Sequence, residues 1–286
     1  KTYYDENPIA KRFVDRFALS PEQLKELSAY ARSKELAFSS TPYAEEEVDF
    51  LLEECCAPFL KIASMELDHL DFLSYIGRKK VPLILSTGMG TMEEIRRAVQ
   101  ILERAGTEQM TLLHCVSIYP TQVETLNLRN ILGLRKEFPQ YPIGFSDHTE
   151  GDAAAIAAVA LGTALVEKHL TLDRTKVGMD NGMATEPESF RQMVASCRMV
   201  QEGLGIEERI VYPEEMKQRR KMRRSVIVIK DFPAGHVLRA EDLYAKRPGT
   251  GISPDKLHLL VGKTLKHKVQ ADTVLREEDL LEDITV

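Results

Sequence analysis

The sequence lacks several features that would place a protein in a specialised class. Its four cysteines (Cys55, Cys56, Cys115 and Cys197) do not have the paired spacings of zinc-binding or redox motifs, so we expect reduced thiols in a cytoplasmic protein. No apolar run approaches the roughly 20 residues of a membrane span, and no signal-peptide pattern opens the chain. Basic residues are not in excess: the net charge of −6 argues against nucleic-acid binding. We therefore expect a globular protein with no membrane and no nucleic-acid partner.

A dinucleotide-binding fingerprint is also missing. Gly88-Met89-Gly90 resembles its beginning but lacks the third glycine at the required offset. Glycines at a strand end also let the backbone approach a ligand closely, and we interpret this turn in that way.

What the sequence does contain is a regular alternation of apolar runs and amphipathic stretches at intervals of about 25 to 30 residues, which is typical of repeated βα units on a parallel sheet. Helix start signals lie between the runs, at Ser20-Pro21-Glu22-Gln23 and Thr91-Met92-Glu93-Glu94. The six predicted strands are Leu36–Tyr43, Phe59–Glu66, Val81–Met89, Met110–Ser117, Tyr141–Thr149 and Ala164–Thr171. A (β/α)₈ TIM barrel needs two more units, and since the chain opens at Lys1 without a strand-like run, we expect them to be missing upstream. An open doubly wound sheet is the alternative.

Polar residues gather at the carboxyl end of nearly every predicted strand. In α/β barrels, active sites are built at this rim from several strands at once. The residues are Ser40 and Thr41; Lys61, Ser64 and Glu66; Ser86 and Thr87; Ser117 and Tyr119; Ser146 and His148; and Glu167 and His169.

Two of these strand ends carry histidines in matching positions, His148 and His169. Side chains alternate along a strand, so Ser146 shares a face with His148, and Glu167 shares one with His169. If the strands are parallel neighbours, the two imidazoles meet and can bind a metal ion that keeps open positions for catalysis. The alternative for each is an ordinary hydrogen-bonded core histidine.

Acids beside such a site are candidates for proton transfer. Glu66 and Glu167 are the two candidates, and the alternative is that one of them only orients a lysine or a histidine. Lys61 has the opposite strand parity to Ser64 and Glu66, so the strand must bulge or twist if all three face the site.

The composition changes near residue 205, and we expect three segments: a catalytic barrel domain over 1–204, a charged linker over 205–224 and a small β-rich domain over 225–286. Lys217–Arg224 is strongly basic, which favours a solvated linker or a surface facing an acidic partner domain over a nucleic-acid patch. The small domain repeats itself, since Val237–Leu243 resembles Val274–Leu280, and this predicts two similar turns that lead into similar short helices.

At these residues the sequence resembles the sialic acid synthase family, which includes legionaminic and pseudaminic acid synthases and a spore-coat polysaccharide enzyme. The resemblance covers essentially the whole chain. In family order the matching motifs are Ser40–Tyr43, Lys61–Glu66, Leu85–Met89, Leu113–Cys115, Ile118–Pro120, Phe145–Thr149, Glu167–His169 and, in a tail similar to the family's antifreeze-like (SAF) domain, Lys246–Gly249.

The resemblance implies a TIM-barrel enzyme that condenses phosphoenolpyruvate with an N-acylated amino sugar, such as N-acetylmannosamine or a 2,4-diacetamido sugar. The products are a nine-carbon 2-keto acid and phosphate, and the bond broken is a C–O bond. It implies that His148 and His169 bind a divalent metal, Mn²⁺ or Mg²⁺, which holds the sugar aldehyde. It also implies that the first two βα units of the family, which carry a glutamate and a phosphate-binding lysine, are absent from this sequence.

Residue roles carry over position by position. Glu66, Tyr119 and Asp180 are implied sugar contacts, with Glu66 also near the proton transfers, and Arg247 is implied to reach the N-acyl group in the neighbouring subunit of a domain-swapped homodimer. The implied phosphoenolpyruvate contacts are Thr41, Lys61, Ser64, Ser86, Ser117 and Ser146. The segment Gly178–Pro187 departs from the family pattern beside the sugar. Two alternatives remain: another phosphoenolpyruvate-dependent keto-acid synthase, and a non-catalytic carbohydrate-binding relative.

Overall fold

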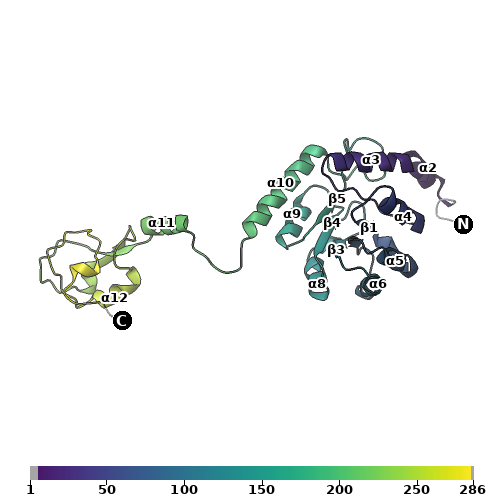
Figure 1. The fold of residues 1–286 in the computed structure, drawn as a ribbon. Coiled ribbons are helices and arrows are strands. Elements are labelled where there is room, and N and C mark those ends of the chain that lie inside the picture. The colour runs from purple at the N-terminus through teal and green to yellow at the C-terminus, as the bar shows by residue number, and fades with distance from the viewer. Residues whose placement is uncertain (1–5, 285–286) are drawn as a thin grey trace. The chain divides into compact units, whose positions relative to one another are not determined.

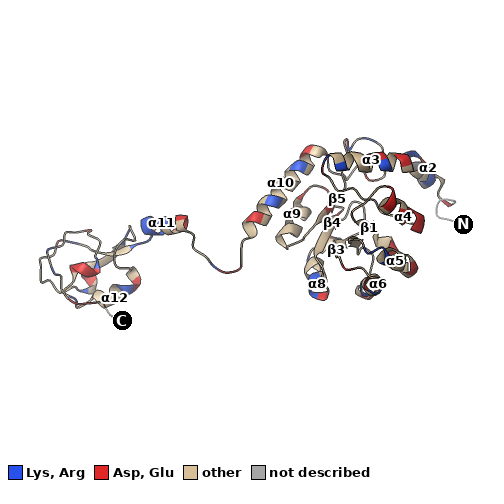
Figure 2. Cartoon of the chain, in the orientation of Figure 1, with Lys and Arg blue, Asp and Glu red and all other residues tan. Residues whose placement is uncertain are grey.

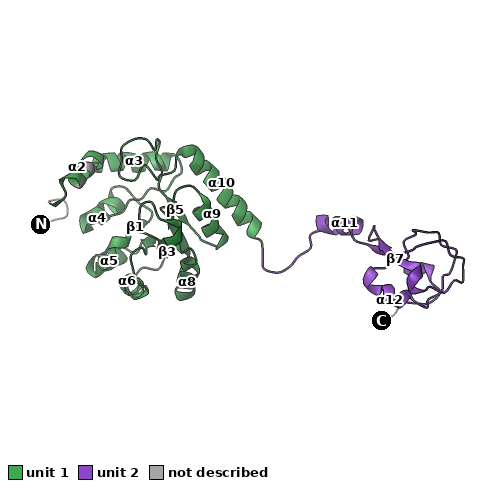
Figure 3. Ribbon diagram, turned by 180° about the vertical axis from the view of Figure 1, so that it is seen from behind, with its two compact units in different colours: residues 1–205 green, residues 206–286 purple. Residues whose placement is uncertain are grey.

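The computed structural model describes residues 6–284. The chain forms two compact units, Lys1–Gly205 and Ile206–Val286 (Figure 3). Among the residues described, no helix has the length and apolar character needed to cross a membrane.

The first unit opens with helices and then alternates strands with helices (Figure 1). In chain order its elements are α2 (Pro8–Phe17), α3 (Pro21–Ser33), α4 (Glu45–Glu53), β1 (Leu60–Ile62), the 3₁₀ helix η1 (Ser64–Glu66), α5 (Leu70–Arg78), β2 (Leu83–Ser86), α6 (Met92–Ala105), β3 (Met110–Cys115), α7 (Val123–Leu126), α8 (Asn130–Glu137), β4 (Ile143–Asp147), α9 (Ala153–Ala160), β5 (Val166–Lys168) and α10 (Pro187–Leu204).

Strands β1 to β5 form one sheet in sequence order, and all four pairings are parallel. A doubly wound sheet reverses its strand order at a switch point, and this sheet has no reversal, so the doubly wound alternative is wrong. The helices that follow the strands lie in an arc around them (Figure 1). The first unit is thus an α/β fold with a parallel half-barrel sheet, in which β1 and β5 are the edge strands within the described residues.

The two faces of the sheet differ sharply in polarity. The outer face packs on the helices, and its side chains, such as Leu60, Leu85, Leu112 and Phe145, are fully buried in one apolar cluster. The inner face carries polar side chains toward the carboxyl ends of the strands. Strand alternation and this burial together determine which side chains can reach a ligand inside the half-barrel.

Both predicted helix start signals are confirmed as capping boxes. The Gln23 backbone N–H donates to Ser20 Oγ (3.3 Å), and the Ser20 N–H donates to Gln23 Oε1 (2.8 Å). Thr91 and Glu94 make the same reciprocal pair at the start of α6. Each box satisfies N–H groups that have no partner within the helix.

Five of the six predicted strands are present, and the strand predicted over Leu36–Tyr43 is wrong because its residues form no ladder. Ser39 Oγ donates to the Phe59 carbonyl (2.6 Å), which precedes β1. A side-chain hydroxyl therefore takes a carbonyl that a backbone N–H would otherwise use in a ladder. Pro42 has no N–H to donate. The predicted bulge before Glu66 is also replaced, since β1 ends at Ile62 and η1 turns the chain instead.

The second unit is a small, β-rich structure with its own apolar cluster, which includes Val226, Leu238, Leu265 and Leu275. Strands β6 and β7 pair antiparallel, and isolated bridges such as Ile227 to Val274 extend the pairing. Its elements are α11 (Pro213–Met222), β6 (Ser225–Val228), η2 (Ala240–Asp242), β7 (Leu243–Lys246), η3 (Pro254–Lys256), α12 (Leu257–Leu260) and η4 (Glu277–Asp279). The predicted repeat is confirmed, because η2 and η4 are equivalent short helices at equivalent positions.

Candidate active site

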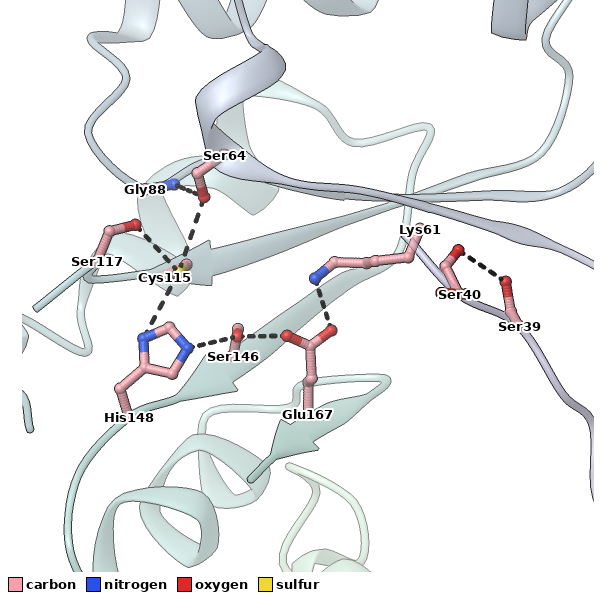
Figure 4. Close-up of polar contacts among 10 residues, drawn as sticks. All are labelled: Ser39, Ser40, Lys61, Ser64, Gly88, Cys115, Ser117, Ser146, His148 and Glu167. Atoms are coloured by element: carbon pink, nitrogen blue, oxygen red, sulfur yellow. Dashed lines mark hydrogen bonds and ion pairs between the residues drawn. The ribbon is translucent and has the colours of Figure 1, made fainter. Parts of the chain in front are cut away.

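Three residues form a row across neighbouring strands on the inner face of the half-barrel. Cys115, Ser146 and Glu167 are register partners on β3, β4 and β5. Ser146 Oγ donates a hydrogen bond to Glu167 Oε1 (2.7 Å), as Figure 4 shows. This row is the floor of the candidate site.

A lysine from the opposite edge of the sheet closes onto this row. Lys61 Nζ on β1 lies 2.7 Å from Glu167 Oε2 on β5 (Figure 4). In a flat sheet these strands would lie four spacings, about 19 Å, apart, too far for a lysine and a glutamate to meet. The contact therefore requires strong curvature, and it brings residues 106 positions apart in the sequence into one site.

The charge on Glu167 follows from these neighbours. Burial alone would raise the pKa of Glu167, but attraction to Lys61 and hydrogen bonds from Lys61 and Ser146 outweigh burial and lower it. The side chain is therefore a carboxylate at neutral pH, able to accept a proton and to hold the lysine in place.

The two histidines meet directly after the ends of β4 and β5. Their ring centroids are 5.3 Å apart at an interplanar angle of 75°. His148 Nδ1 lies 2.8 Å from the Val116 carbonyl, so this nitrogen carries a proton and donates it. In the neutral ring the lone pair is then on Nε2, which lies 3.4 Å from Ser146 Oγ.

The two rings differ in their affinity for a proton. Burial and the nearby His148 lower the pKa of His169, despite the opposing charges of Asp180 and Glu167. Burial would also lower the pKa of His148, but hydrogen bonds with the Cys115 sulfur and the Val116 carbonyl, together with the negative charge of Cys115, outweigh burial and raise it. His169 is accordingly a neutral imidazole at pH 7, and His148 binds a cation through Nε2 only in its neutral form.

Tyr119 and Asp180 complete the histidine side of the site. The Tyr119 ring lies 4.2 Å from His148 and 5.8 Å from His169, centroid to centroid. Burial, with the negative charges of Cys115 and Asp180, raises the pKa of Tyr119 to about 12, so its hydroxyl stays a hydrogen-bond donor. Asp180 Oδ2 is 3.8 Å from His169 Nδ1, close enough for attraction but too far for a hydrogen bond.

A second group of small polar side chains surrounds Cys115. Its Sγ lies 3.8 Å from both Ser64 Oγ and Ser117 Oγ, and 4.0 Å from His148 Nδ1 (Figure 4). Ser64 Oγ accepts a hydrogen bond from the Gly88 N–H (2.9 Å). Sequence reasoning gave Cys115 no role, although its alternation with Ser117 at the end of a strand was a usable signal.

Ser86 lies on the same inner face, at the end of β2. It is 3% exposed, and its hydroxyl is buried without a hydrogen-bond partner among residues 6–284. Buried hydroxyls are usually paired, so an unpaired one facing the interior of the half-barrel is suited to a polar ligand.

The structure does not connect the other predicted residues to this cluster. Thr41 borders a groove of about 540 Å³ whose lining includes Leu24, Tyr43 and Phe50. Glu66 is buried, and its carboxylate contacts His69 Nδ1 at 2.9 Å. Arg247 belongs to the second unit, where it donates to Met222 Sδ.

The side chains around the two imidazoles limit the kind of metal ion that could bind there. Within residues 6–284, no three His, Cys, Asp or Glu side chains are grouped as a ligand set. The two imidazoles therefore do not suit a closed structural site, but they do fit an ion that keeps several positions for water and substrate.

Known proteins provide an independent comparison. The sequence profile of the NeuB family matches residues 2–209, and the profile of the SAF domain matches residues 223–281. The chain belongs to the NeuB family. It is 35% identical to the N,N'-diacetyllegionaminic acid synthase of Legionella pneumophila over 266 aligned residues. The alignment covers 92% of this chain and 74% of that protein.

Solved structures agree with the family assignment. A sialic acid synthetase from Leptospira borgpetersenii superposes with a TM-score of 0.70 at 30% identity, covering 75% of this chain and 74% of that one. A putative spore coat polysaccharide biosynthesis protein from Chromobacterium violaceum superposes with a TM-score of 0.72 at 29% identity, covering 94% of this chain and 81% of that one. The predicted resemblance to sialic acid synthases is thus confirmed, and this NeuB-family chain is an enzyme of the sialic acid synthase type.

Proposed function

We propose that this chain condenses phosphoenolpyruvate with an N-acylated amino sugar to give a nine-carbon 2-keto acid and phosphate. The observation that carries the proposal is the convergence of Lys61, Glu167 and the two imidazoles on one inner rim. An anion-binding lysine beside a pair of potential metal ligands is what a reaction between an anionic enol and an aldehyde requires. Relatives named for legionaminic and sialic acid synthesis support the substrate class.

The anionic substrate occupies the polar floor of the half-barrel in this proposal. Lys61 supplies the positive charge, and its 2.7 Å contact with Glu167 fixes the direction of the side chain. Hydroxyls provide the remaining donors, and the unpaired Ser86 hydroxyl gains a partner when substrate enters. The residues assigned to phosphoenolpyruvate are Thr41, Lys61, Ser64, Ser86, Ser117 and Ser146.

The acceptor aldehyde lies on the histidine side. His148, through Nε2, and His169 would hold a divalent ion, Mn²⁺ or Mg²⁺, which when bound polarises the aldehyde oxygen. The Tyr119 hydroxyl and Asp180 contact the sugar. C3 of phosphoenolpyruvate forms a bond to the aldehyde carbon, water adds at C2, and phosphate leaves with cleavage of the C–O bond.

Two carboxylates serve the proton transfers. Glu167 is ionised at neutral pH, so it can take a proton from the attacking water. Glu66 is the other candidate, placed by η1 and held by His69.

The second unit completes the site from another subunit. In this proposal a domain-swapped homodimer places Arg247 of one copy at the N-acyl group bound by the other. Each unit by itself carries a strongly charged helix, since α4 is rich in Glu and α11 has Lys and Arg in its last turn (Figure 2). We infer a cytoplasmic enzyme, since phosphoenolpyruvate is a cytoplasmic metabolite.

The test is a product assay with the protein, phosphoenolpyruvate, Mn²⁺ and a panel of N-acylated hexosamines. We expect phosphate release only with a matching sugar, and a keto acid whose mass equals the sugar plus a pyruvate unit. Chelation, or the double variant His148→Ala/His169→Ala, should abolish release. Phosphate release by that variant would contradict the metal assignment. Turnover only with a phosphorylated five- or four-carbon sugar would identify another keto-acid synthase. Sugar binding without turnover would identify a non-catalytic relative.

A further inference from the structure

A buried ion pair lies on the opposite face of the sheet from the candidate site. Asp147 and Lys168, on β4 and β5, are register partners, and their side chains are 0% and 1% exposed. Each one is adjacent in sequence to site residues, because Asp147 lies between Ser146 and His148 and Lys168 lies between Glu167 and His169. Since strand side chains alternate, the pair is directly behind the site and touches no substrate.

The pair closes a turn around His148. Lys168 Nζ donates to Asp147 Oδ2 (2.8 Å) and to the Thr149 carbonyl (2.6 Å). The other carboxylate oxygen, Oδ1, accepts from the Thr149 N–H (2.9 Å) and the Thr149 hydroxyl (2.8 Å). Residues on both sides of His148 are therefore tied to the residue that precedes His169.

This tie occurs where the regular sheet has ended. Strand β4 stops at Asp147 and β5 stops at Lys168, so within the described part of the chain no parallel ladder pairs the two histidines. Segments beyond strand ends are usually the mobile parts of a fold. Two hydrogen bonds from Lys168 Nζ join the two strand ends at this point, and two to Asp147 Oδ1 fix the turn that they reach.

Stability alone is a poor explanation for the pair. Removing two charges from water costs several kcal/mol, and apolar replacements of buried ion pairs are often neutral or stabilising. What charges supply and apolar side chains do not is a fixed direction, which a pair of metal ligands needs.

We propose that Asp147 and Lys168 are positioning residues that set the separation and orientation of the His148 and His169 imidazoles. The proposal rests on the proposed function in one respect, that these imidazoles would bind a divalent ion. It assigns the 5.3 Å, T-shaped arrangement of the rings to contacts made behind the sheet.

The test replaces both members of the pair, so that no buried charge is left uncompensated. The double variant Asp147→Leu/Lys168→Met should unfold at the wild-type temperature or higher, yet bind Mn²⁺ at least about tenfold more weakly, as outer-shell changes at metal sites do. Binding is measured from the loss of the free Mn²⁺ signal in electron paramagnetic resonance. The matched control is Asp49→Leu/Lys79→Met, an ion pair on the outside of the same unit, which should leave Mn²⁺ affinity unchanged.

A second readout does not depend on metal. In protein labelled with ¹⁵N-histidine, the wild-type His148 ring, assigned with His148→Gln, should show the tautomer with the proton on Nδ1. The double variant should show averaging between tautomers. Equal Mn²⁺ affinity or an unchanged ring spectrum in a folded double variant would overturn the positioning role. If the wild type binds no Mn²⁺, the metal assignment fails, and the ring spectrum still decides the positioning role.

Discussion

At the scale of single residues, three histidines near neighbouring strand ends have the same chemistry and different surroundings. His114 is on the outer face, where it is 4% exposed, lies 2.8 Å from the Leu126 carbonyl and stacks on Phe145. Burial lowers its pKa, so it is a neutral core residue. His148 and His169 face each other instead. Their strand parity, not their residue type, separates the candidate ligands from the core histidine.

A glycine next to the site provides a test at this scale. A Cβ at Gly88 would lie 2.3 Å from Ser117 Oγ and 2.9 Å from Ser64 Oγ, so a methyl group must displace both hydroxyls. We expect Gly88→Ala to lower kcat/KM for phosphoenolpyruvate by roughly 10- to 100-fold, the usual effect of misplacing substrate contacts by an ångström.

The control for this change is the same substitution in helix α8. No atom of residues 6–284 lies within 4 Å of a Cβ added at Gly133, so Gly133→Ala should leave kinetics unchanged and raise stability by about 0.5–1 kcal/mol. Steady-state kinetics and denaturant unfolding of both variants check the prediction. Wild-type kinetics for Gly88→Ala would show that the two serines do not contact substrate.

At the scale of elements, short helices decide where side chains point. The 3₁₀ helix η1 resolves the parity conflict between Lys61 and Ser64 that strand alternation creates. In the second unit, η2 and η4 repeat one capping arrangement: an aspartate at the third position accepts from the backbone N–H of the preceding arginine, Arg239 or Arg276. Each aspartate also contacts a histidine at 2.8 or 2.9 Å.

This arrangement predicts an acid-sensitive second unit. Burial would raise the pKa of Asp242, but hydrogen bonds from His236 and from the Arg239 backbone N–H outweigh burial and lower it. A lowered pKa means that the stabilisation is complete above the unfolded value, about 3.9, and is lost as the pH falls through the folded value. Asp242→Asn should therefore flatten the loss of stability below about pH 4.

Thermal unfolding followed by circular dichroism between pH 2.5 and 7 measures this dependence. The control is Glu241→Gln, which removes a neighbouring carboxylate that is 70% exposed. It should keep the wild-type profile. A profile for Asp242→Asn that also matches the wild type would exclude the cap as the source of acid sensitivity.

At the scale of the whole molecule, the proposed swapped dimer makes each site depend on two chains. A His148→Ala subunit has a defective barrel and an intact tail, and an Arg247→Ala subunit has the reverse. When the two variants are mixed in equal amounts and allowed to exchange subunits, half of the dimers should contain one subunit of each kind. Each such dimer has one complete site out of two, so about a quarter of wild-type activity should return.

Activity of the two variants apart and together, with dimers verified by sedimentation, checks this expectation. A mixture no more active than the sum of its parts would place Arg247 outside the neighbouring site. That result is also expected if each chain completes its own site, because every site in both variants then carries a defect.

The sequence by itself determined the local features of this protein. Periodicity placed five of the six strands, capping residues placed the starts of α3 and α6, and the ordered motifs identified the family, because all of these depend on residues close together in the chain. The strand predicted over Leu36–Tyr43 was wrong. Its apolar pattern suits a strand, but its residues do not pair with a neighbouring strand, and a strand requires partners as well as propensity.

Only the tertiary structure decided which distant residues meet. The contact from Lys61 to Glu167 depends on sheet curvature, the unpaired Ser86 hydroxyl depends on its neighbours, and the pairing of Asp147 with Lys168 depends on register. None of these can be determined from local pattern, because each depends on how strands far apart in the chain are placed against one another. The two histidines were visible in the sequence, but the geometry that lets them act together was not.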